Sequence, residues 1–248
     1  MTDLPAHLPL IAATFLLAGL VKGVIGLGLP TVAMGLLGMA MAPAEAAALL
    51  LVPSLVTNLW QLAAGPRFGP LLRRLATMML GIVAGSWAGS GLLAGDHAGL
   101  AQAGLGIALL AYAGLGLTRW RFHVAPQAEA WAGPLVGMAT GLVTGATGVF
   151  VLPAVPYLAA LRLERDALVQ ALGLSFTVST LALGAGLAWH GALPMPSVGA
   201  SLLALVPALL GMLLGGRLRS RVRAETFRLC FFLGLLGLGA EITLRALT

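Results

Sequence analysis

The sequence predicts an all-α, polytopic membrane protein made of two inverted repeats, each with a broken or re-entrant segment followed by three transmembrane helices. Three observations predict this class: an extremely apolar composition, long apolar segments, and a glycine motif that occurs twice. The 248 residues are 59% hydrophobic and 9% charged, with a mean hydropathy of +1.00. Soluble domains carry about 25% charged residues, so this composition indicates a protein solvated by lipid.

Six segments have the length and apolarity of a membrane span, which needs about 20 apolar residues. They are residues 44–62, 75–93, 100–117, 167–189, 198–216 and 227–244. Two other segments, residues 8–41 and 131–161, are too long for one span, at roughly 50 Å and 45 Å if fully helical. Both have Gly, Thr and Pro clustered near the middle. We expect each to form two short helical pieces joined by a break, either a re-entrant hairpin or a pair of short spans.

The arginines gather in short loops, which is typical of cytoplasmic loops. Four predicted loops carry them: Arg67, Arg73 and Arg74; Arg119 and Arg121; Arg162 and Arg165; and Arg217, Arg219, Arg221 and Arg223. The loops at Asp96–His97 and at 190–196 carry no Lys or Arg and are expected to face outward. The alternation places both termini outside if each broken segment returns to its starting side. Arg245 argues against that placement of the C-terminus.

The two halves, residues 1–122 and 123–248, repeat a pattern of glycines. Gly19, Gly23 and Gly26 match Gly141, Gly145 and Gly148 at one constant offset, and Pro30 matches Pro153 with one inserted residue. Later, Gly81, Gly85 and Gly89 have the spacing of Pro207, Gly211 and Gly215. A returning pair plus three spans makes an odd number of crossings, so the second repeat would be inverted. Secondary transporters recurrently use this plan, with the site between the repeats; the alternative is that glycine repeats arise from composition alone.

The first motif, Gly19-Leu-Val-Lys-Gly-Val-Ile-Gly-Leu-Gly-Leu-Pro30, followed by Leu51-Val-Pro-Ser-Leu-Val-Thr-Asn-Leu-Trp-Gln61, resembles the TauE/SafE family of membrane permeases. This family is also called the toluene sulfonate uptake permeases. The second motif, residues 141–153, resembles the family's repeated half, although Gly28-Leu29 and Phe150-Val151 stand where some members have Gly-Gly. The resemblance covers nearly the whole chain. It implies transport of sulfite, organosulfonates, thiosulfate or other small organic anions at the bacterial inner membrane.

Lys22 is the only lysine, and it lies inside an apolar segment. A charge at the centre of a membrane helix costs about 2.5–3.5 kcal/mol on insertion scales, so such residues usually face a cavity. We predict that Lys22 meets an anion at the first break. The alternative is that the side chain extends to the membrane surface from a helix end.

Other candidates for binding the anion lie at the breaks and on the next helix of each half. The break residues are Gly23, Gly26, Thr31, Thr144, Gly145, Thr147 and Gly148. Helix N-termini at such breaks favour anions; the alternative is that the glycines only pack and the threonines bond to their own helix. Asn58 and Gln61 share one helical face with Ser54, and Gln170 occurs in the second half. The alternative for these amides is hydrogen bonding that only joins helices.

The sequence predicts neither catalytic residues nor a metal or cofactor site. The carboxylates fall in loops or near helix ends, Cys230 is the only cysteine, and no zinc-protease, serine-hydrolase or Walker motif occurs. An enzyme, a cation transporter and a nucleic-acid-binding protein are therefore disfavoured. The interpretation is a secondary transporter for a small anion, working by alternating access in a lipid bilayer; the alternative is an anion channel with the same site. Homo-oligomerisation is left open.

Overall fold

The computed structural model describes residues 4–65, 68–95, 98–118, 123–193 and 195–247, and every regular element in these residues is a helix. The all-α membrane class is thereby confirmed. The predicted loop residues Arg67, Asp96, His97, Arg119 and Arg121 lie outside the described residues. The elements are α1 (Leu4–Ile25), α2 (Leu29–Leu37), α3 (Pro43–Ala63), α4 (Phe68–Ala94), α5 (Ala98–Leu117), η1 (Pro126–Ala128), α6 (Glu129–Thr147), α7 (Ala154–Ala160), α8 (Arg165–Trp189), α9 (Met195–Leu218) and α10 (Ala224–Leu247).

Seven of the described helices are long and apolar enough to cross a membrane, compared with six predicted spans. The six correspond to α3, α4, α5, α8, α9 and α10, and the seventh is α1. The prediction of two short pieces is wrong for the first broken segment, because the 22 residues of α1 extend about 33 Å before the break. In the second broken segment α6 has 19 residues and α7 has 7.

One helix, α4, extends well beyond the apolar segment from which it was predicted. α4 begins at Phe68 instead of residue 75, so Arg73 and Arg74 lie in its first two turns and not in a loop. Arg74 donates two hydrogen bonds, of 2.8 and 2.6 Å, to the Glu129 carboxylate at the start of α6. A helix can continue past the lipid where its side chains become polar, and hydropathy does not record this continuation.

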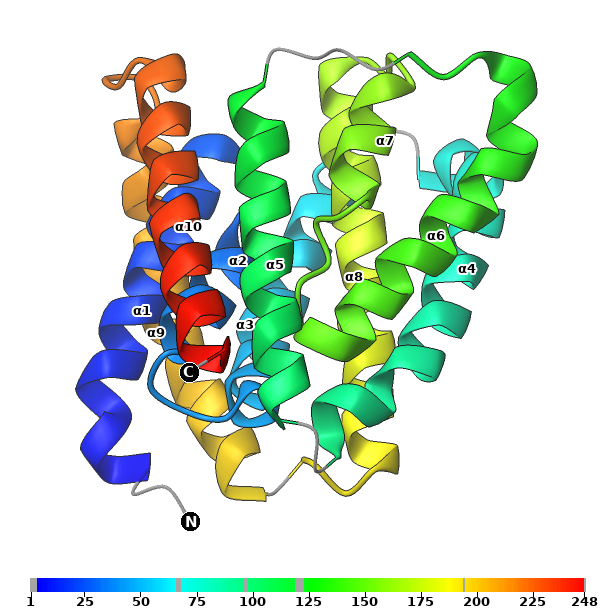
Figure 1. Ribbon diagram of the computed structural model, residues 1–248. Coiled ribbons are helices and arrows are strands. Elements are labelled where there is room, and N and C mark those ends of the chain that lie inside the picture. The colour runs from blue at the N-terminus through cyan, green and yellow to red at the C-terminus, as the bar shows by residue number, and fades with distance from the viewer. Residues whose placement is uncertain (1–3, 66–67, 96–97, 119–122, 194, 248) are drawn as a thin grey trace.

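Figure 1 shows how the helix directions alternate between the two ends of the molecule. α3 and α5 rise and α4 descends, whereas α8 and α10 descend and α9 rises. α1 and α3 both begin at the lower end, and α6 and α8 both begin at the upper end. The connections after α7 and α9 lie at the upper end, and they carry the described loop arginines Arg162, Arg219, Arg221 and Arg223.

Exposed tryptophans lie near both ends of the helices. Trp60, near the end of α3, and Trp131, near the start of α6, are 71% and 62% exposed at the arginine-rich end. Trp87 and Trp189 lie toward the opposite end with ring centroids 5.3 Å apart. Tryptophan is enriched at both membrane–water interfaces, so these rings indicate where the lipid headgroups lie.

The helix pairs with the most extensive contact join the two halves: α1 packs on α9, α4 on α6, α5 on α10 and α3 on α8. A Cβ atom added to Gly23 of α1 would overlap the backbone of α9, and one added to Gly215 of α9 would overlap the backbone of α1. The same relation joins Gly145 of α6 to α4, and Gly85 of α4 to α6. The repeated glycines therefore bring the backbones of opposite halves into contact, as small residues do in membrane helix packing.

We predict that Gly145→Ala lowers the free energy of unfolding of the detergent-purified protein by about 1–3 kcal/mol, because overpacking displaces the helix backbones. The melting temperature should fall accordingly. The new methyl group would meet backbone atoms of Ser86 and Ser90, which cannot rotate away. Gly237→Ala in α10 is the matched control, since nothing lies within 4 Å of its added Cβ. Alanine there should leave the melting temperature unchanged or slightly raise it. Equal melting temperatures for the two variants would contradict backbone contact at Gly145.

Candidate functional site

The first break is made by two glycines between α1 and α2. Gly26 and Gly28 have φ angles of +85° and +104°, which residues with a Cβ rarely adopt. The Gly26 N–H donates to the Lys22 carbonyl at 2.7 Å and closes α1. Pro30 lies in the first turn of α2, where its missing N–H and fixed φ suit a helix start. Only Gly26 of the two predicted first-motif glycines is needed for the break, because Gly23 packs on α9.

Lys22 lies one turn before this break and is 4% exposed. Its amine donates to the Thr57 hydroxyl at 3.1 Å and to the Asn58 Oδ1 atom, both on α3. Thr57 and Asn58 are themselves buried. The side chain of Lys22 therefore points into the protein, and the alternative of a lysine extending to the surface does not describe this geometry.

The polar partners of Lys22 are oriented by further hydrogen bonds. The Thr57 hydroxyl donates to the Pro53 carbonyl at 2.7 Å, and the Asn58 amide donates to the Thr180 hydroxyl of α8 at 3.4 Å. Thr180 in turn donates to the Phe176 carbonyl at 2.7 Å. Each donor is directed away from Lys22, so only the oxygens of Thr57 and Asn58 are presented to the amine.

Two glutamines join α3 to α8 near the same end. The Gln61 amide donates to the carbonyls of Gly26 and Val169, both at 3.1 Å, while the Gln170 amide donates to Leu62 and Gly65 at 3.0 and 2.8 Å. Gln61 thus ties the first break to both central helices. Gln170 holds the end of α3, which agrees with the alternative of helix joining more than with contact to a ligand.

Lys22, Thr57, Asn58 and Thr180 form the Lys22 cluster. Pro53 interrupts the hydrogen-bond ladder of α3 beside this cluster. Because proline has no N–H, the Leu49 carbonyl lacks its usual helical partner. Ser201 of α9 donates to that carbonyl at 2.8 Å and accepts from the Val52 N–H at 3.1 Å. Ser201, which the sequence did not single out, therefore anchors α9 to the middle of α3.

Several buried polar atoms have no hydrogen-bond partner among the described residues. They are the hydroxyls of Thr31, Ser54, Ser86, Ser175 and Ser179 and the Oε1 atom of Gln61. Ser54 lies one turn before Asn58 on the same face of α3. An unsatisfied buried polar group costs about 1–3 kcal/mol, so a ligand that supplied partners here would recover that free energy.

The second break, residues 148–153, differs from the first. Gly148 has a φ of +71° and ends α6, and its N–H donates to the Thr144 carbonyl at 2.8 Å. The Thr144 and Thr147 hydroxyls donate to carbonyls of their own helix at 2.7 Å, so the alternative interpretation describes these two threonines. Phe150 fills this break and is fully buried, with its ring centroid 5.5 Å from that of Phe176.

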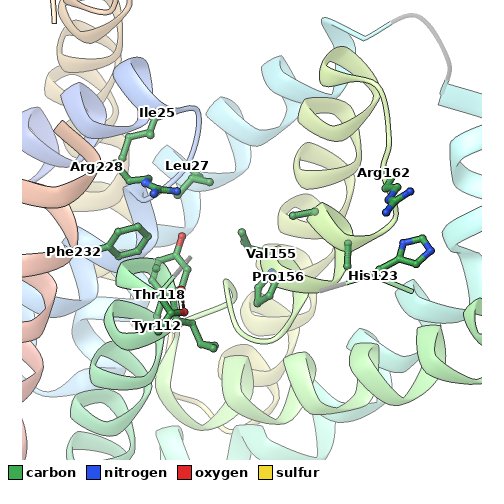
Figure 2. A pocket seen from close by; sticks show the side chains of 14 residues that line it. Ile25, Leu27, Tyr112, Thr118, His123, Val155, Pro156, Arg162, Arg228 and Phe232 are labelled. Atoms are coloured by element: carbon green, nitrogen blue, oxygen red, sulfur yellow. Dashed lines mark hydrogen bonds between the residues drawn. The ribbon is translucent and has the colours of Figure 1, made fainter. Parts of the chain in front are cut away.

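A cavity of about 690 Å³ is lined by residues of the first break and of α7, which follows the second break. Figure 2 shows Arg228 of α10 beside Ile25 and Leu27 on one side, and His123 beside Arg162 on the other. Its lining contains these three basic residues and no acidic residue; the others are Tyr112, Leu115, Gly116, Thr118, Val155, Pro156, Ala159, Ala160 and Phe232. The cavity therefore has the charge that an anion requires.

The cavity reaches the first break, because Ile25 and Leu27 flank Gly26. The Gly26 carbonyl accepts from Gln61, which lies one turn from Asn58. Residues of the first break therefore line the cavity, and the same break is hydrogen-bonded to α3 one turn from Asn58. The sequence identified neither His123 nor Arg228, which lies just inside the apolar segment of α10.

Within the described residues, no group of three His, Cys, Asp or Glu side chains could hold a metal ion. The polar atoms of the Lys22 cluster are instead hydroxyls, amides and one amine. A buried amine, together with the unpartnered Ser54 hydroxyl on the same face of α3, suits an anion better than a cation.

The family model described as "Sulfite exporter TauE/SafE" matches residues 11–242, nearly the whole chain. The match includes both breaks, the Lys22 cluster and the cavity. Neither the comparison with curated proteins nor that with solved structures gives a match.

We predict that Asn58→Leu lowers the free energy of unfolding by about 1–3 kcal/mol, because the buried Lys22 amine loses an acceptor. Adding Lys22→Met should restore most of this loss, since the second change removes the group that lacks a partner. Thermal denaturation of the wild type, both single variants and the double variant gives the four unfolding free energies of a double-mutant cycle. Additive losses would show that Lys22 and Asn58 do not interact.

Proposed function

Because the chain belongs to the TauE/SafE sulfite exporter family, we propose that it is a secondary transporter of a small anion, with Lys22 at the centre of its binding site. Sulfite, an organosulfonate, or a related sulfur-containing or carboxylate anion is the proposed substrate class. The observation that carries this proposal is the buried Lys22 amine, which is held by two neutral oxygens and no carboxylate within the described residues.

A buried amine without a counter-charge favours an anion that enters its surroundings. Charges in a low-dielectric interior are strongly disfavoured unless they are paired and hydrogen-bonded. A bound anion would pair with the protonated amine, and unpartnered hydroxyls such as that of Ser54 would replace part of its hydration shell. Thr57 and Asn58 would hold the amine in position during the exchange of anion for water.

The cavity provides the route to this site from one end. Arg228, Arg162 and His123 would attract the anion electrostatically, and movement of the first break would open the path to Lys22. The positive-inside rule places this arginine-rich end in the cytoplasm of the cell. Both termini would then lie outside, and the membrane would be the bacterial inner membrane.

Alternating access follows from the proposed inversion of the two halves. Corresponding helices run in opposite directions (Figure 1), and each major helix contact joins one half to the other. Rocking at the glycine contacts of α1 with α9, and of α4 with α6, would transfer access from one end to the other. In inverted-repeat transporters such rocking occurs around a site between the repeats.

We predict that proteoliposomes loaded with unlabelled thiosulfate, sulfite or isethionate transiently accumulate the same labelled anion from outside. Lys22→Met should reduce this counterflow about 10- to 100-fold, because hydrogen bonds to charged groups contribute about 1.5–3 kcal/mol. Arg221→Gln, at an exposed residue of the same end, is the matched control and should retain it.

Counterflow also separates a transporter from a channel, which equilibrates the label without transient accumulation. Uptake without accumulation in the wild type would therefore favour the channel. Full counterflow by a correctly folded Lys22→Met protein would instead exclude Lys22 from the site.

We predict that Arg228→Gln raises the half-saturating anion concentration about 2- to 5-fold on the cavity side, since an exposed charge contributes about 0.5–1 kcal/mol. The difference should shrink at high ionic strength because salt screens the guanidinium. Arg219→Gln tests surface charge at the same end without touching the cavity lining. Equal changes in the two variants would show that the cavity does not guide the anion.

A further inference from the structure

The number of hydrogen bonds around Lys22 indicates how many protons its amine carries in this structure. A neutral amine has two N–H donors, and a protonated amine has three. Among the described residues, the amine has two acceptors, Thr57 Oγ1 and Asn58 Oδ1. Two acceptors match a neutral amine, whereas a protonated amine would leave one buried donor without a partner.

The surrounding hydrogen bonds fix this count. Thr57 and Thr180 each use their hydroxyl hydrogen on a carbonyl of their own helix. The Asn58 amide hydrogens face Thr180, so its oxygen faces Lys22. None of these groups can turn to supply a third acceptor without breaking a bond that is already made.

Among the described residues, no charged side chain forms a hydrogen bond or an ion pair with the Lys22 amine. The helices packed around this part of α1 are α2, α3, α9 and α10, and α8 is reached through Asn58. α2 has no titratable residue, and the only charged residue of α3, Glu45, lies 13 residues before Asn58, about 20 Å along the helix. The titratable residues of the other three are Arg217 on α9; Glu225, Arg228, Cys230, Glu241 and Arg245 on α10; and Arg165 and Asp166 on α8.

We propose that the anion and one proton bind together, with the proton on the Lys22 amine, so that Lys22 is the proton-coupling residue of transport. This inference rests on the proposed function. On binding, one proton from the solution adds to the nitrogen lone pair, and the ammonium group donates its third N–H to the anion. The anion is the third acceptor, in addition to Thr57 Oγ1 and Asn58 Oδ1.

Simultaneous binding follows from the charge balance of the site. An anion beside a neutral amine would leave a negative charge unpaired in the protein interior, and a proton without the anion would leave a positive one. The charges of the proton and a monoanion cancel, and the proton reduces the net charge of a bound dianion. Release on the other side returns both the anion and the proton to solution, so a pH gradient would drive net transport.

The first test measures protons in the wild-type protein. Detergent-purified protein is titrated with thiosulfate, which carries no proton near neutral pH, in weakly buffered solution with a pH indicator; isethionate replaces it if thiosulfate gives no counterflow. We expect uptake of one proton per bound anion. In proteoliposomes with a trapped pH dye and a clamped membrane potential, anion entry should acidify the lumen, and uptake should quicken as the external pH falls.

Lys22→Arg provides the matched variant, because a guanidinium keeps its proton at any ordinary pH. We expect it to bind thiosulfate with reduced affinity and to take up no proton. Arg219→Gln should behave as the wild type. Proton uptake that persists in Lys22→Arg, or anion binding by the wild type without proton uptake, would overturn the coupling role. Counterflow without proton movement would overturn this inference alone, whereas absence of counterflow with every anion would overturn the proposed function as well.

Discussion

The structure depends on one constraint: a helix can be interrupted within a membrane only where the surrounding protein satisfies its backbone. Both breaks meet this constraint inside the bundle. At the first, Gln61 donates to the freed Gly26 carbonyl, and at the second, the Thr147 hydroxyl accepts from the Val149 N–H at 3.2 Å. Close glycine contacts between α1 and α9 and between α4 and α6 bring the helices near enough to enclose these segments. The glycines that bring the two halves into contact are therefore also required to enclose the two breaks.

The two breaks share a glycine pattern but have opposite chemical character. Lys22 precedes the first, whereas Thr144, at the same place in the repeated motif, precedes the second and bonds to its own helix. The Gln61 amide donates to the first break, and Phe150 packed on Phe176 fills the second. Thus the buried amine of the proposed site lies in the first half, whereas the three basic residues that line the cavity lie in the second. The second half contributes Thr180, which orients Asn58, and the apolar wall of the cavity at Val155.

Hydropathy was sufficient to predict the six full spans, because side chains that contact lipid are apolar. The length of the other two segments, with their clustered Gly, Thr and Pro, predicted the breaks. Hydropathy could not predict that α4 starts at Phe68, since Arg73 and Arg74 interrupt the apolar sequence in the first two turns. Lys22 and Asn58 were each recognisable as polar residues in apolar surroundings, but their pairing joins positions 36 residues apart. The glycine motif alone did not distinguish Gly26, which needs a positive φ, from Gly23, which needs only space. The sequence did not predict Arg228 as a site residue, because α10 has the composition of an ordinary apolar span. Its position in the cavity lining depends on the packing of α10 against the other helices.

The absence of a carboxylate from the Lys22 interactions of the described residues has a mechanistic consequence. An aspartate or glutamate beside the amine would form a pair that an incoming anion must displace, and breaking a buried ion pair costs about 3–5 kcal/mol. Neutral oxygens from Thr57 and Asn58 hold the same amine without competing for its charge. In the proposed transport cycle these oxygens would remain in place when an anion arrived, so binding would add a partner and remove none. Release of the anion would then require no ion pair of the protein to form again, which suits exchange on both sides of the membrane.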